Sequence, residues 1–193
     1  MDGSAIARAT LAEQVAAVAD TIVVIGEPHR PSRGFLHWRD LLFPCALGRG
    51  GVRADKIEGD GATPTGDWAL RRLWYRPDRF REPPRGALPS RPISRDDGWC
   101  DAPGAPDYNR PVRLPYAASH ERLWRDDDLY DLVVELGYND APVVPGRGSA
   151  IFLHVARRDY APTEGCVALW RDDLLSLLAV LPADATIRIA AGR

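Results

Sequence analysis

The sequence predicts a mainly β protein with few helices. Its 193 residues include 17 Gly and 17 Pro, residue types that end strands and form turns. Most apolar runs are short and bounded by such turns, and leucine repeats at helical spacing only near the C-terminus. With 45% hydrophobic and 27% charged residues, the composition is that of a globular protein with a substantial core. We therefore expect one domain of ordinary size in mixed β packing.

Strands are predicted in several places along the chain. The β-branched run at residues 21–25 is the first, and residues 35–47 alternate imperfectly, which predicts a second strand region with a turn near 39–40. Residues 150–155 form a continuous apolar run, which is typical of a buried central strand. Further strands are predicted at residues 67–70, 129–136 and 186–190.

Helical structure is predicted in three places. An Ala-rich helical segment is expected over residues 1–20, ahead of a single domain at residues 21–193. A short helical turn is expected over residues 119–125. The leucine repeat predicts a helix over residues 172–181 that packs on the sheet.

Residues 76–120 are dense in Pro, Arg, Asp and Gly and predict a long, ordered loop insertion. Loops of this length in a compact domain are usually functional or locally packed, and this one is a candidate lid. Arginines cluster around its start, but acidic residues interleave with them, so a solvated face is favoured over an anion-binding patch. The cluster consists of Arg71, Arg72, Arg76, Arg79, Arg81 and Arg85.

Charge and composition argue against several partners. The net charge of −2 and the pI of about 6.1 give no overall field that favours nucleic acid or an anionic membrane. No apolar run is long enough to span a bilayer. Residues 48–66 contain six glycines, but the Gly-Lys-Ser/Thr ending and the following helix of a phosphate loop are missing, so nucleotide binding is disfavoured.

The three cysteines are too few and too scattered for a disulfide framework or a zinc site. Cys45 and Cys100 are expected to be unpaired thiols, with a disulfide between them as the alternative in an oxidising compartment. The spacing of the four histidines suggests no metal site, and neither a metal nor a cofactor is expected.

Cys166 and His154 are candidates for a catalytic pair. His154 ends the apolar run, and Cys166 lies twelve positions later, after Gly165 at a loop-to-strand junction. A strand and a returning loop of this length would bring imidazole and thiol together, which is how a cysteine nucleophile is activated. The backbone N–H groups of Gly165 and Cys166 are candidates for stabilising an oxyanion. From the pattern alone, two unrelated core residues remain the alternative interpretation.

Three sequence features together resemble the L,D-transpeptidase catalytic domain of the YkuD family. That family places a His on a strand and follows it with Ser/Thr-x-Gly-Cys, matched here by His154 and residues 163–166. Residues 59–66 resemble its Gly-x-x-x-Thr-Pro-x-Gly loop, with Lys56 just upstream. Tyr138-Asn139 and residues 145–149 resemble the ErfK/YbiS/YcfS/YnhG-like branch, so the resemblance covers roughly residues 40–190.

The resemblance implies a β-sandwich of mixed sheets with a C-terminal helix, in which the His strand is central. It implies Cys166 as the nucleophile and His154 as its base or ion-pair partner, with the backbone carbonyl of Val155 orienting the imidazole. It also implies the Gly165 N–H as an oxyanion donor. Residues implied to bind the substrate are Tyr138, Asn139, Thr163, Glu164 and Ala168.

Two positions depart from the family pattern. Glu164 stands where the family commonly has His, and Ala168 stands where it has Arg. Loss of that guanidinium removes a fixed cation that would hold a substrate carboxylate. The Arg-less variant resembles a proteobacterial subgroup associated with 1-3 instead of 3-3 cross-links.

The resemblance implies a peptidoglycan L,D-transpeptidase, with stem peptides as partners and a periplasmic location. Residues 1–20 lack the basic start and uninterrupted apolar block of a secretory signal, which conflicts with that location. The first alternative is a cysteine amidase or L,D-carboxypeptidase that hydrolyses stem peptides or protein–peptidoglycan links. The second is an inactive wall-binding module.

Overall fold

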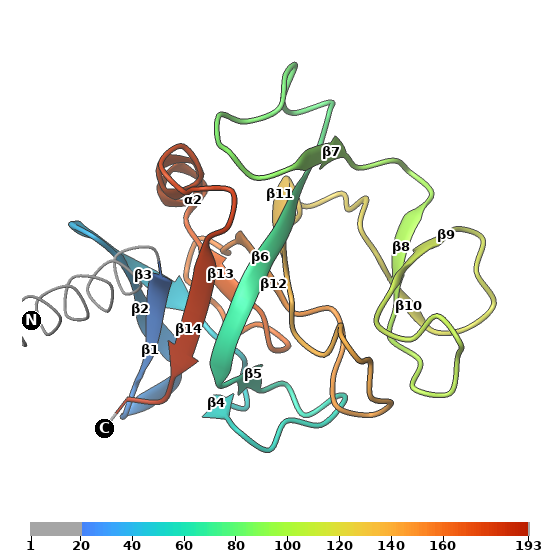
Figure 1. Cartoon of the computed structure of the whole chain (residues 1–193), viewed down its shortest axis with the longest axis horizontal. Helices are drawn as coiled ribbons and strands as arrows, with labels where there is room; N and C mark the ends of the chain where they lie inside the picture. The colour runs from blue at the N-terminus through green and yellow to red at the C-terminus, as the bar shows by residue number, and fades with distance from the viewer. Residues whose placement is uncertain (1–20, 193) are drawn as a thin grey trace, which may run out of the picture.

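The computed structural model describes residues 21–192. The helical segment predicted over residues 1–20 therefore lies outside the described residues, and the predicted division at residue 21 stays a prediction. Within the described part, the mainly β class with mixed sheets is confirmed (Figure 1).

One large sheet forms the body of the domain. Its strands run in the order β11-β12-β13-β3-β2-β1-β14-β6-β7, and β11 also pairs with β6, so the sheet closes on itself around a single core (Figure 1). The members are β1 (Thr21–Glu27), β2 (Arg30–Trp38), β3 (Leu41–Ala46), β6 (Gly66–Tyr75), β7 (Ser90–Pro92), β11 (Leu132–Leu136), β12 (Phe152–Val155), β13 (Val167–Leu169) and β14 (Thr186–Ala190).

The strand pattern follows the alternation of apolar residues. Ile22 and Val24 of β1 and Ile187 and Ile189 of β14 are all buried in the core, because alternate side chains of paired strands point to the same face. The predicted strand at 186–190 is confirmed with the same bounds. The turn predicted near residues 39–40 is also confirmed, since Trp38 pairs with Leu41 across it.

The chain between β6 and β11 holds more regular structure than its Pro-rich sequence predicted. It contributes β7 to the edge of the large sheet and builds a second, three-stranded sheet in the order β10-β8-β9. These strands are β8 (Asp97–Cys100), β9 (Pro111–Arg113) and β10 (His120–Arg122). The short helical turn predicted over residues 119–125 is wrong, because His120–Arg122 pairs with β8 instead of folding on itself. We call residues 76–131 the insertion.

The insertion packs on the outside of the large sheet. The outward-facing Trp74, Val133 and Phe152 form a second core cluster with insertion residues. The insertion contributes Ile93, Trp99, Leu123, Leu129 and Tyr130 to this cluster. The ring of Trp99 packs edge-on against Phe152, with ring centroids 5.1 Å apart. One face of β12 is thus covered by the insertion while the other faces the main core.

Helix α2 (Arg171–Leu178) is the single helix within residues 21–192 and lies near the C-terminus, as predicted. It begins one residue earlier than predicted and ends three residues earlier. Leu174, Leu177 and Leu178 lie in the main core, so the leucine repeat packs on the sheet. In the described part of the chain, no helix is both long and apolar enough to cross a membrane.

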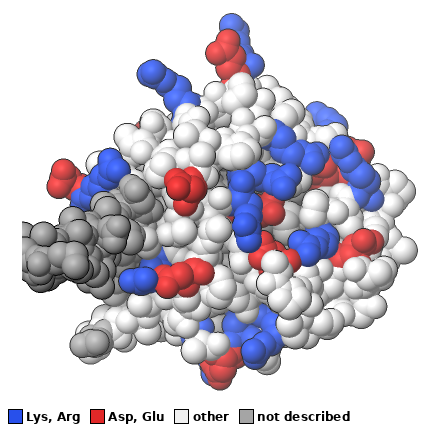
Figure 2. Space-filling view, viewed as in Figure 1, with Lys and Arg blue, Asp and Glu red and all other residues white. Residues whose placement is uncertain are grey.

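The arginine cluster forms ion pairs, on the surface for Arg71 and Arg72 but in a buried position for Arg76, which is 3% exposed and pairs with Asp78 at 2.8 Å. Arg71 pairs with Asp140 at 2.8 Å and Arg72 with Glu135 at 3.1 Å. Figure 2 shows basic and acidic side chains interspersed on the viewed face. The surface pairs agree with the prediction of a solvated face.

A small two-stranded sheet lies within the glycine-rich segment, residues 48–66, and pairs its two arms. It pairs β4 (Val52–Arg53) with β5 (Thr63–Pro64) in parallel. Cys45 and Cys100 are buried, free thiols, as the sequence predicted.

Candidate active site

His154 and Cys166 lie on the same outward face of neighbouring strands. Strands β12 and β13 are parallel, and His154 is in register with Ala168. Because side chains alternate along a strand, Cys166, two residues before Ala168, faces the same side as His154. The intervening Leu153 and Val167 point into the main core.

A cavity of about 320 Å³ lies on this outward face, and both His154 and Cys166 line it. Its walls come from the glycine-rich segment, the insertion, and the loop before the nucleophile. The lining also includes Lys56, Glu58, Gly59, Asp101, Glu121, Arg125, Leu129, Tyr130, Ser149, Ala150, Arg157, Ala161, Pro162, Thr163, Glu164 and Ala168. The structure thus joins four of the predicted site residues, Thr163, Glu164, Cys166 and Ala168, to His154 in a single cavity.

The imidazole of His154 is buried and oriented by the backbone. Its Nδ1 lies 2.8 Å from the carbonyl oxygen of Val155, the contact that the resemblance implied. A carbonyl accepts hydrogen bonds only, so Nδ1 carries the proton and Nε2 is left as the basic nitrogen. Burial, assisted by the positive charges of Arg125 and Arg157, lowers the pKa of His154 to about 4, and the bond to Val155 offsets only part of this.

The thiol of Cys166 is also held in its neutral form. Its Sγ donates to the Ala150 carbonyl at 3.2 Å and accepts from the Phe152 N–H at 3.3 Å. Burial, and then the negative charge of Glu121, raise the pKa of this thiol to about 12. These two pKa shifts favour the neutral thiol and the neutral imidazole, and so the base role for His154 over the ion-pair role.

Thr163 shapes the turn that presents the nucleophile. Its Oγ1 donates to the Cys166 carbonyl at 2.6 Å and accepts the Gly165 N–H at 3.2 Å. Gly165 has φ +134°, and a Cβ there would lie 2.8 Å from the Ala62 carbonyl oxygen, so the turn requires glycine. The Gly165 N–H that the resemblance assigned to the oxyanion is therefore bound to Thr163 in the resting structure.

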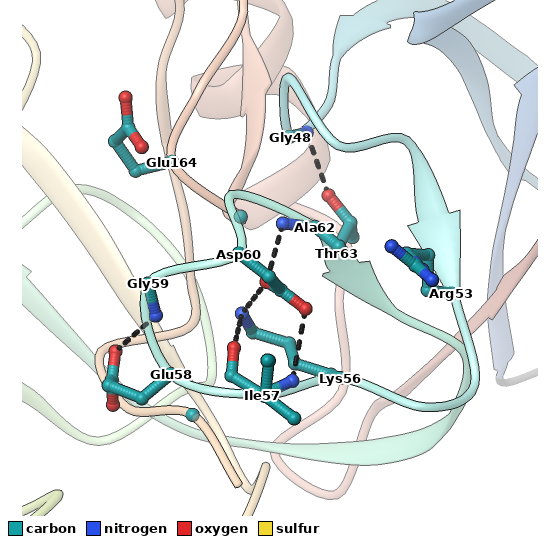
Figure 3. Close-up of polar contacts among 12 residues, drawn as sticks. Gly48, Arg53, Lys56, Ile57, Glu58, Gly59, Asp60, Ala62, Thr63 and Glu164 are labelled. Atoms are coloured by element: carbon teal, nitrogen blue, oxygen red, sulfur yellow. Dashed lines mark hydrogen bonds and ion pairs between the residues drawn. The ribbon is translucent and has the colours of Figure 1, made fainter. Parts of the chain in front are cut away.

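The glycine-rich segment forms a wall of the cavity and is organised around Asp60 (Figure 3). One Asp60 oxygen accepts from Lys56 Nζ at 2.7 Å and from the Ala62 N–H at 2.8 Å, and the other accepts from the Ile57 N–H at 3.0 Å. Although burial opposes it, these hydrogen bonds lower the pKa of Asp60. The carboxylate thus occupies the N–H groups that a phosphate loop would offer to a nucleotide.

The glycine-rich segment is bound to the nucleophile loop by backbone and side-chain contacts. Gly48 bridges to Thr163 in parallel, and the Arg49 N–H donates to the Thr163 carbonyl at 2.9 Å. Within the segment, the Gly48 N–H donates to Thr63 Oγ1 at 2.8 Å (Figure 3). Arg49 forms an ion pair with Glu164, whose side chain is 75% exposed at the cavity rim. The Glu164 side chain therefore lies at a position where it can contact a molecule bound in the cavity.

Tyr138 and Asn139, also predicted to bind substrate, do not line the cavity. The Tyr138 hydroxyl donates to the Arg147 carbonyl, and the Asn139 amide bonds to the backbone of Val144 and Gly148. Both side chains brace the loop before β12 in this structure, and their role toward substrate stays a prediction.

Asn109 is an important site residue that the sequence analysis missed. Its Oδ1 accepts from Trp99 Nε1 at 3.0 Å and from the Ala150 N–H at 3.1 Å, while Nδ2 donates to the carbonyls of Tyr138 and Asn139. Ala150 has φ +52°, an unfavourable conformation for a residue with a side chain, and Asn109 helps to hold it there. Since the Ala150 carbonyl accepts the Cys166 thiol, this insertion residue helps to position the nucleophile.

Glu121 and Tyr130 of the insertion were missed as well. The Tyr130 hydroxyl donates to Glu121 Oε1 at 2.6 Å, and its ring meets the His154 ring edge-on at 5.2 Å between centroids. No motif marks either residue in the sequence. Their place in the site depends on the pairing of β10 with β8 and on the packing of the insertion. Within residues 21–192, no group of three or more potential ligand side chains is arranged to hold a metal.

A buried cysteine and a backbone-oriented histidine in one partly open cavity form a candidate site for cysteine-based acyl transfer. A sequence model of the YkuD family, described as the L,D-transpeptidase catalytic domain, matches residues 32–189. The chain therefore belongs to the YkuD L,D-transpeptidase catalytic domain family. A search of curated proteins gives no match.

Three solved structures show the level of structural similarity. L,D-transpeptidase 1 of Mycobacterium tuberculosis is 11% identical with a TM-score of 0.39, over 89% of this chain and 60% of that one. An L,D-transpeptidase from Mycobacterium smegmatis is 10% identical with a TM-score of 0.40, over 89% and 59%. L,D-transpeptidase 3 of Mycobacterium tuberculosis is 13% identical with a TM-score of 0.37, over 88% and 61%. This chain spans about three fifths of their lengths, and we base the family assignment on the sequence model alone.

Proposed function

We propose that this protein is a peptidoglycan L,D-transpeptidase that uses Cys166 as its nucleophile. The observation that carries the proposal is the placement of Cys166 and His154 on one face of β12 and β13, inside a cavity. The Val155 carbonyl holds the imidazole so that Nε2 is the free base. Membership of the family supplies the substrate class, which is a peptidoglycan stem peptide.

In the first half-reaction, His154 Nε2 takes the proton of Cys166 as the sulfur attacks an amide carbonyl on an L-centre. The new C–S bond gives a tetrahedral oxyanion, for which the N–H groups of Cys166 and Gly165 are the proposed donors. The amine of the neighbouring D-residue leaves with the proton from His154, and a thioester acyl-enzyme remains. In the second half-reaction, a diaminopimelate side-chain amine of another stem attacks the thioester and forms the cross-link.

We assign donor choice to the two positions that depart from the family pattern. Ala168 lies beside His154 in register and lines the cavity, so the cavity wall carries a methyl group where the family has a guanidinium. Glu164 adds a negative charge at the rim. Both changes weaken recognition of a donor carboxylate at this point, which supports 1-3 in preference to 3-3 cross-links.

Peptidoglycan stems lie outside the inner membrane, so we propose a periplasmic site of action. Fractionation of cells that express the complete protein, followed by detection of this chain, tests that location. Recovery only with cytoplasmic markers would contradict it.

The test of the activity is incubation of the purified protein with muropeptide monomers, followed by chromatography and mass analysis. We expect a dimer peak and a covalent acyl-enzyme adduct on the wild-type protein, and loss of both in Cys166→Ala. Cys100→Ala is the matched control, because Cys100 is buried but does not line the cavity. Dimers that persist in Cys166→Ala would overturn the proposal.

The same experiment separates the alternatives. Shortened monomers without dimers would identify a cysteine amidase or carboxypeptidase, in which water is the acceptor. Unchanged monomers with binding to sacculi would identify an inactive wall-binding module. Tandem mass analysis of the dimer distinguishes 1-3 from 3-3 linkage.

A further inference from the structure

The insertion places two carboxylates in the cavity wall. Glu121 belongs to β10, and Asp101 directly follows β8. The two are brought together because His120 pairs with Cys100 between these strands, and both residues line the cavity that contains Cys166. The negative charge of Glu121 acts on the Cys166 sulfur, and Asp101 acts on Glu121. The pair thus forms an acidic corner beside the nucleophile.

The acidic corner retains unused capacity to accept hydrogen bonds. Glu121 Oε1 accepts from the Tyr130 hydroxyl, while Oε2 has no hydrogen-bond donor within residues 21–192. Its nearest cation is Arg125, 3.9 Å from Oε1, and that guanidinium donates twice to Asp127 at 2.8 Å. Asp101 Oδ1 is buried and likewise accepts no hydrogen bond from the described residues. The Asp101 Oδ1 atom is buried without a donor, which is costly, and the Glu121 side chain is 29% exposed and lines the cavity. Together the two carboxylates point to a cationic donor that enters the cavity.

We propose that Glu121 and Asp101 bind the ammonium group of the acceptor amine, and that Glu121 takes the first proton from it. This inference rests on the proposed function and concerns the second half-reaction of the same site. An ammonium group has three N–H donors, and the acidic corner offers two carboxylates with free oxygens. Charge-assisted hydrogen bonds of this kind are stronger than those between neutral groups.

A side-chain amine has an ordinary pKa of about 10.4, so it reaches the cavity as an unreactive ammonium. The His154 imidazole is a weak base here, whereas burial raises the pKa of Glu121 above its ordinary value and makes its carboxylate a stronger proton acceptor. Because the acidic corner binds a cation, it also favours an amine over water as the acceptor of the acyl group, and so favours transfer over hydrolysis.

The proton and bond balance of the step is complete. The ammonium gives one proton to the Glu121 carboxylate and becomes a neutral amine with a free electron pair. That pair forms the C–N bond to the thioester carbon, and a second proton passes from nitrogen to His154. The C–S bond then breaks, its electron pair stays on sulfur, and His154 returns the proton to give the Cys166 thiol. The products are an amide, a neutral thiol and a Glu121 carboxylic acid that releases its proton to water.

The test compares two acceptors on the same acyl-enzyme. The ammonium acceptor is Nα-acetyl-lysine, and the neutral acceptor is hydroxylamine, which is uncharged at pH 7. A stem tetrapeptide serves as donor, and the rates of acyl-enzyme formation, aminolysis and hydrolysis are measured separately. The variants are Glu121→Gln and Asp101→Asn. Asp126→Asn is the matched control, because it removes one negative charge from an exposed position of the insertion that does not line the cavity.

For Glu121→Gln we expect kcat/KM for Nα-acetyl-lysine to fall about 10-fold or more, through both a higher KM and a lower kcat, with hydroxylamine and water reacting within about 3-fold of the wild-type rate. Asp101→Asn should show the same selectivity to a smaller degree, and Asp126→Asn should show none. Equal loss with both acceptors would mean that Glu121 is only structural, and an unchanged preference for the ammonium acceptor would also overturn the inference. If wild-type protein formed no acyl-enzyme, the proposed function itself would fail, an outcome distinct from these.

Discussion

The buried imidazole of His154 should make the stability of the folded protein fall in mild acid. Its pKa is lowered from the ordinary value of 6.5 to about 4, with burial as the main cause. Between pH 6.5 and pH 4 the unfolded chain therefore binds a proton that the folded chain excludes, so unfolding becomes more favourable as the pH falls. The stabilisation is complete above pH 6.5 and is lost as the pH decreases through this window.

The size of the effect follows from the two values. The folded and unfolded pKa values are about 2.5 pH units apart, and each unit corresponds to about 1.4 kcal/mol, so the loss is about 3 kcal/mol by pH 4. The free energy of unfolding is measured by urea titration at pH 7.5 and at pH 4.5, for the wild-type protein and for His154→Gln. Since the variant has no imidazole to titrate at this position, its free energy should decrease less between the two pH values, by about 2 to 3 kcal/mol.

His37→Gln provides the matched control, because His37 is exposed on β2. Its pH dependence should follow that of the wild-type protein. Carboxylates titrate in the same range in all three proteins, so only the difference between variants reports on His154. If wild-type protein and His154→Gln lost the same free energy, the imidazole would not be held neutral by burial.

Three further predictions concern the groups around the site. Iodoacetamide should alkylate Cys166 about 1000-fold more slowly at pH 7 than an unstructured cysteine peptide, because the pKa of this thiol is raised to about 12; a rate that levels off below pH 8 would contradict this. Asn109→Leu should cost about 2 to 4 kcal/mol of unfolding free energy in urea titration, since it leaves several buried polar groups without partners. Lys56→Met should cost about 3 to 5 kcal/mol, because it leaves Asp60 buried and unpaired, whereas the exposed Arg53→Met should cost less than about 1 kcal/mol; equal costs would contradict the buried pairing.

The strands of the large sheet were largely predictable because the residue pattern that favours each strand lies within that strand and its adjacent turn. The strand predicted over residues 186–190 matches the bounds of β14, where side chains alternate between the core and the outer face. The turn predicted near residues 39–40 joins β2 to β3 in a hairpin. The candidate pair His154 and Cys166 was recognisable because its members lie at strand junctions within one short segment. The role of the Val155 carbonyl was implied by the family resemblance, and the structure shows the contact with His154 Nδ1.

The insertion was not predictable in the same way. Its strands are three or four residues long, and they exist only because β8 finds partners in β9 and β10. Such pairing depends on contacts between distant residues, which no window of the sequence contains. For the same reason, the sequence does not reveal the roles of Asn109 and Glu121, because each residue reaches the site only when the insertion packs over β12. Tyr138 is a different case, since a motif position implies a role in substrate binding, and in this structure its hydroxyl donates to the Arg147 carbonyl, so that role stays a prediction.

The insertion also determines the chemical state of the nucleophile. Cys166 and His154 sit on the outer face of a sheet, where they would be exposed to solvent if Tyr130, Glu121 and their neighbours did not cover them. That cover leaves each side chain only 6% exposed, and burial is the first cause of both pKa shifts. A neutral, buried thiol reacts slowly with oxidants and alkylating agents. In the proposed mechanism, the proton transfer from Cys166 to His154 is therefore coupled to binding of a substrate that brings its own carbonyl to the sulfur. Burial would thus restrict the reactivity of the thiol to the complex with its donor.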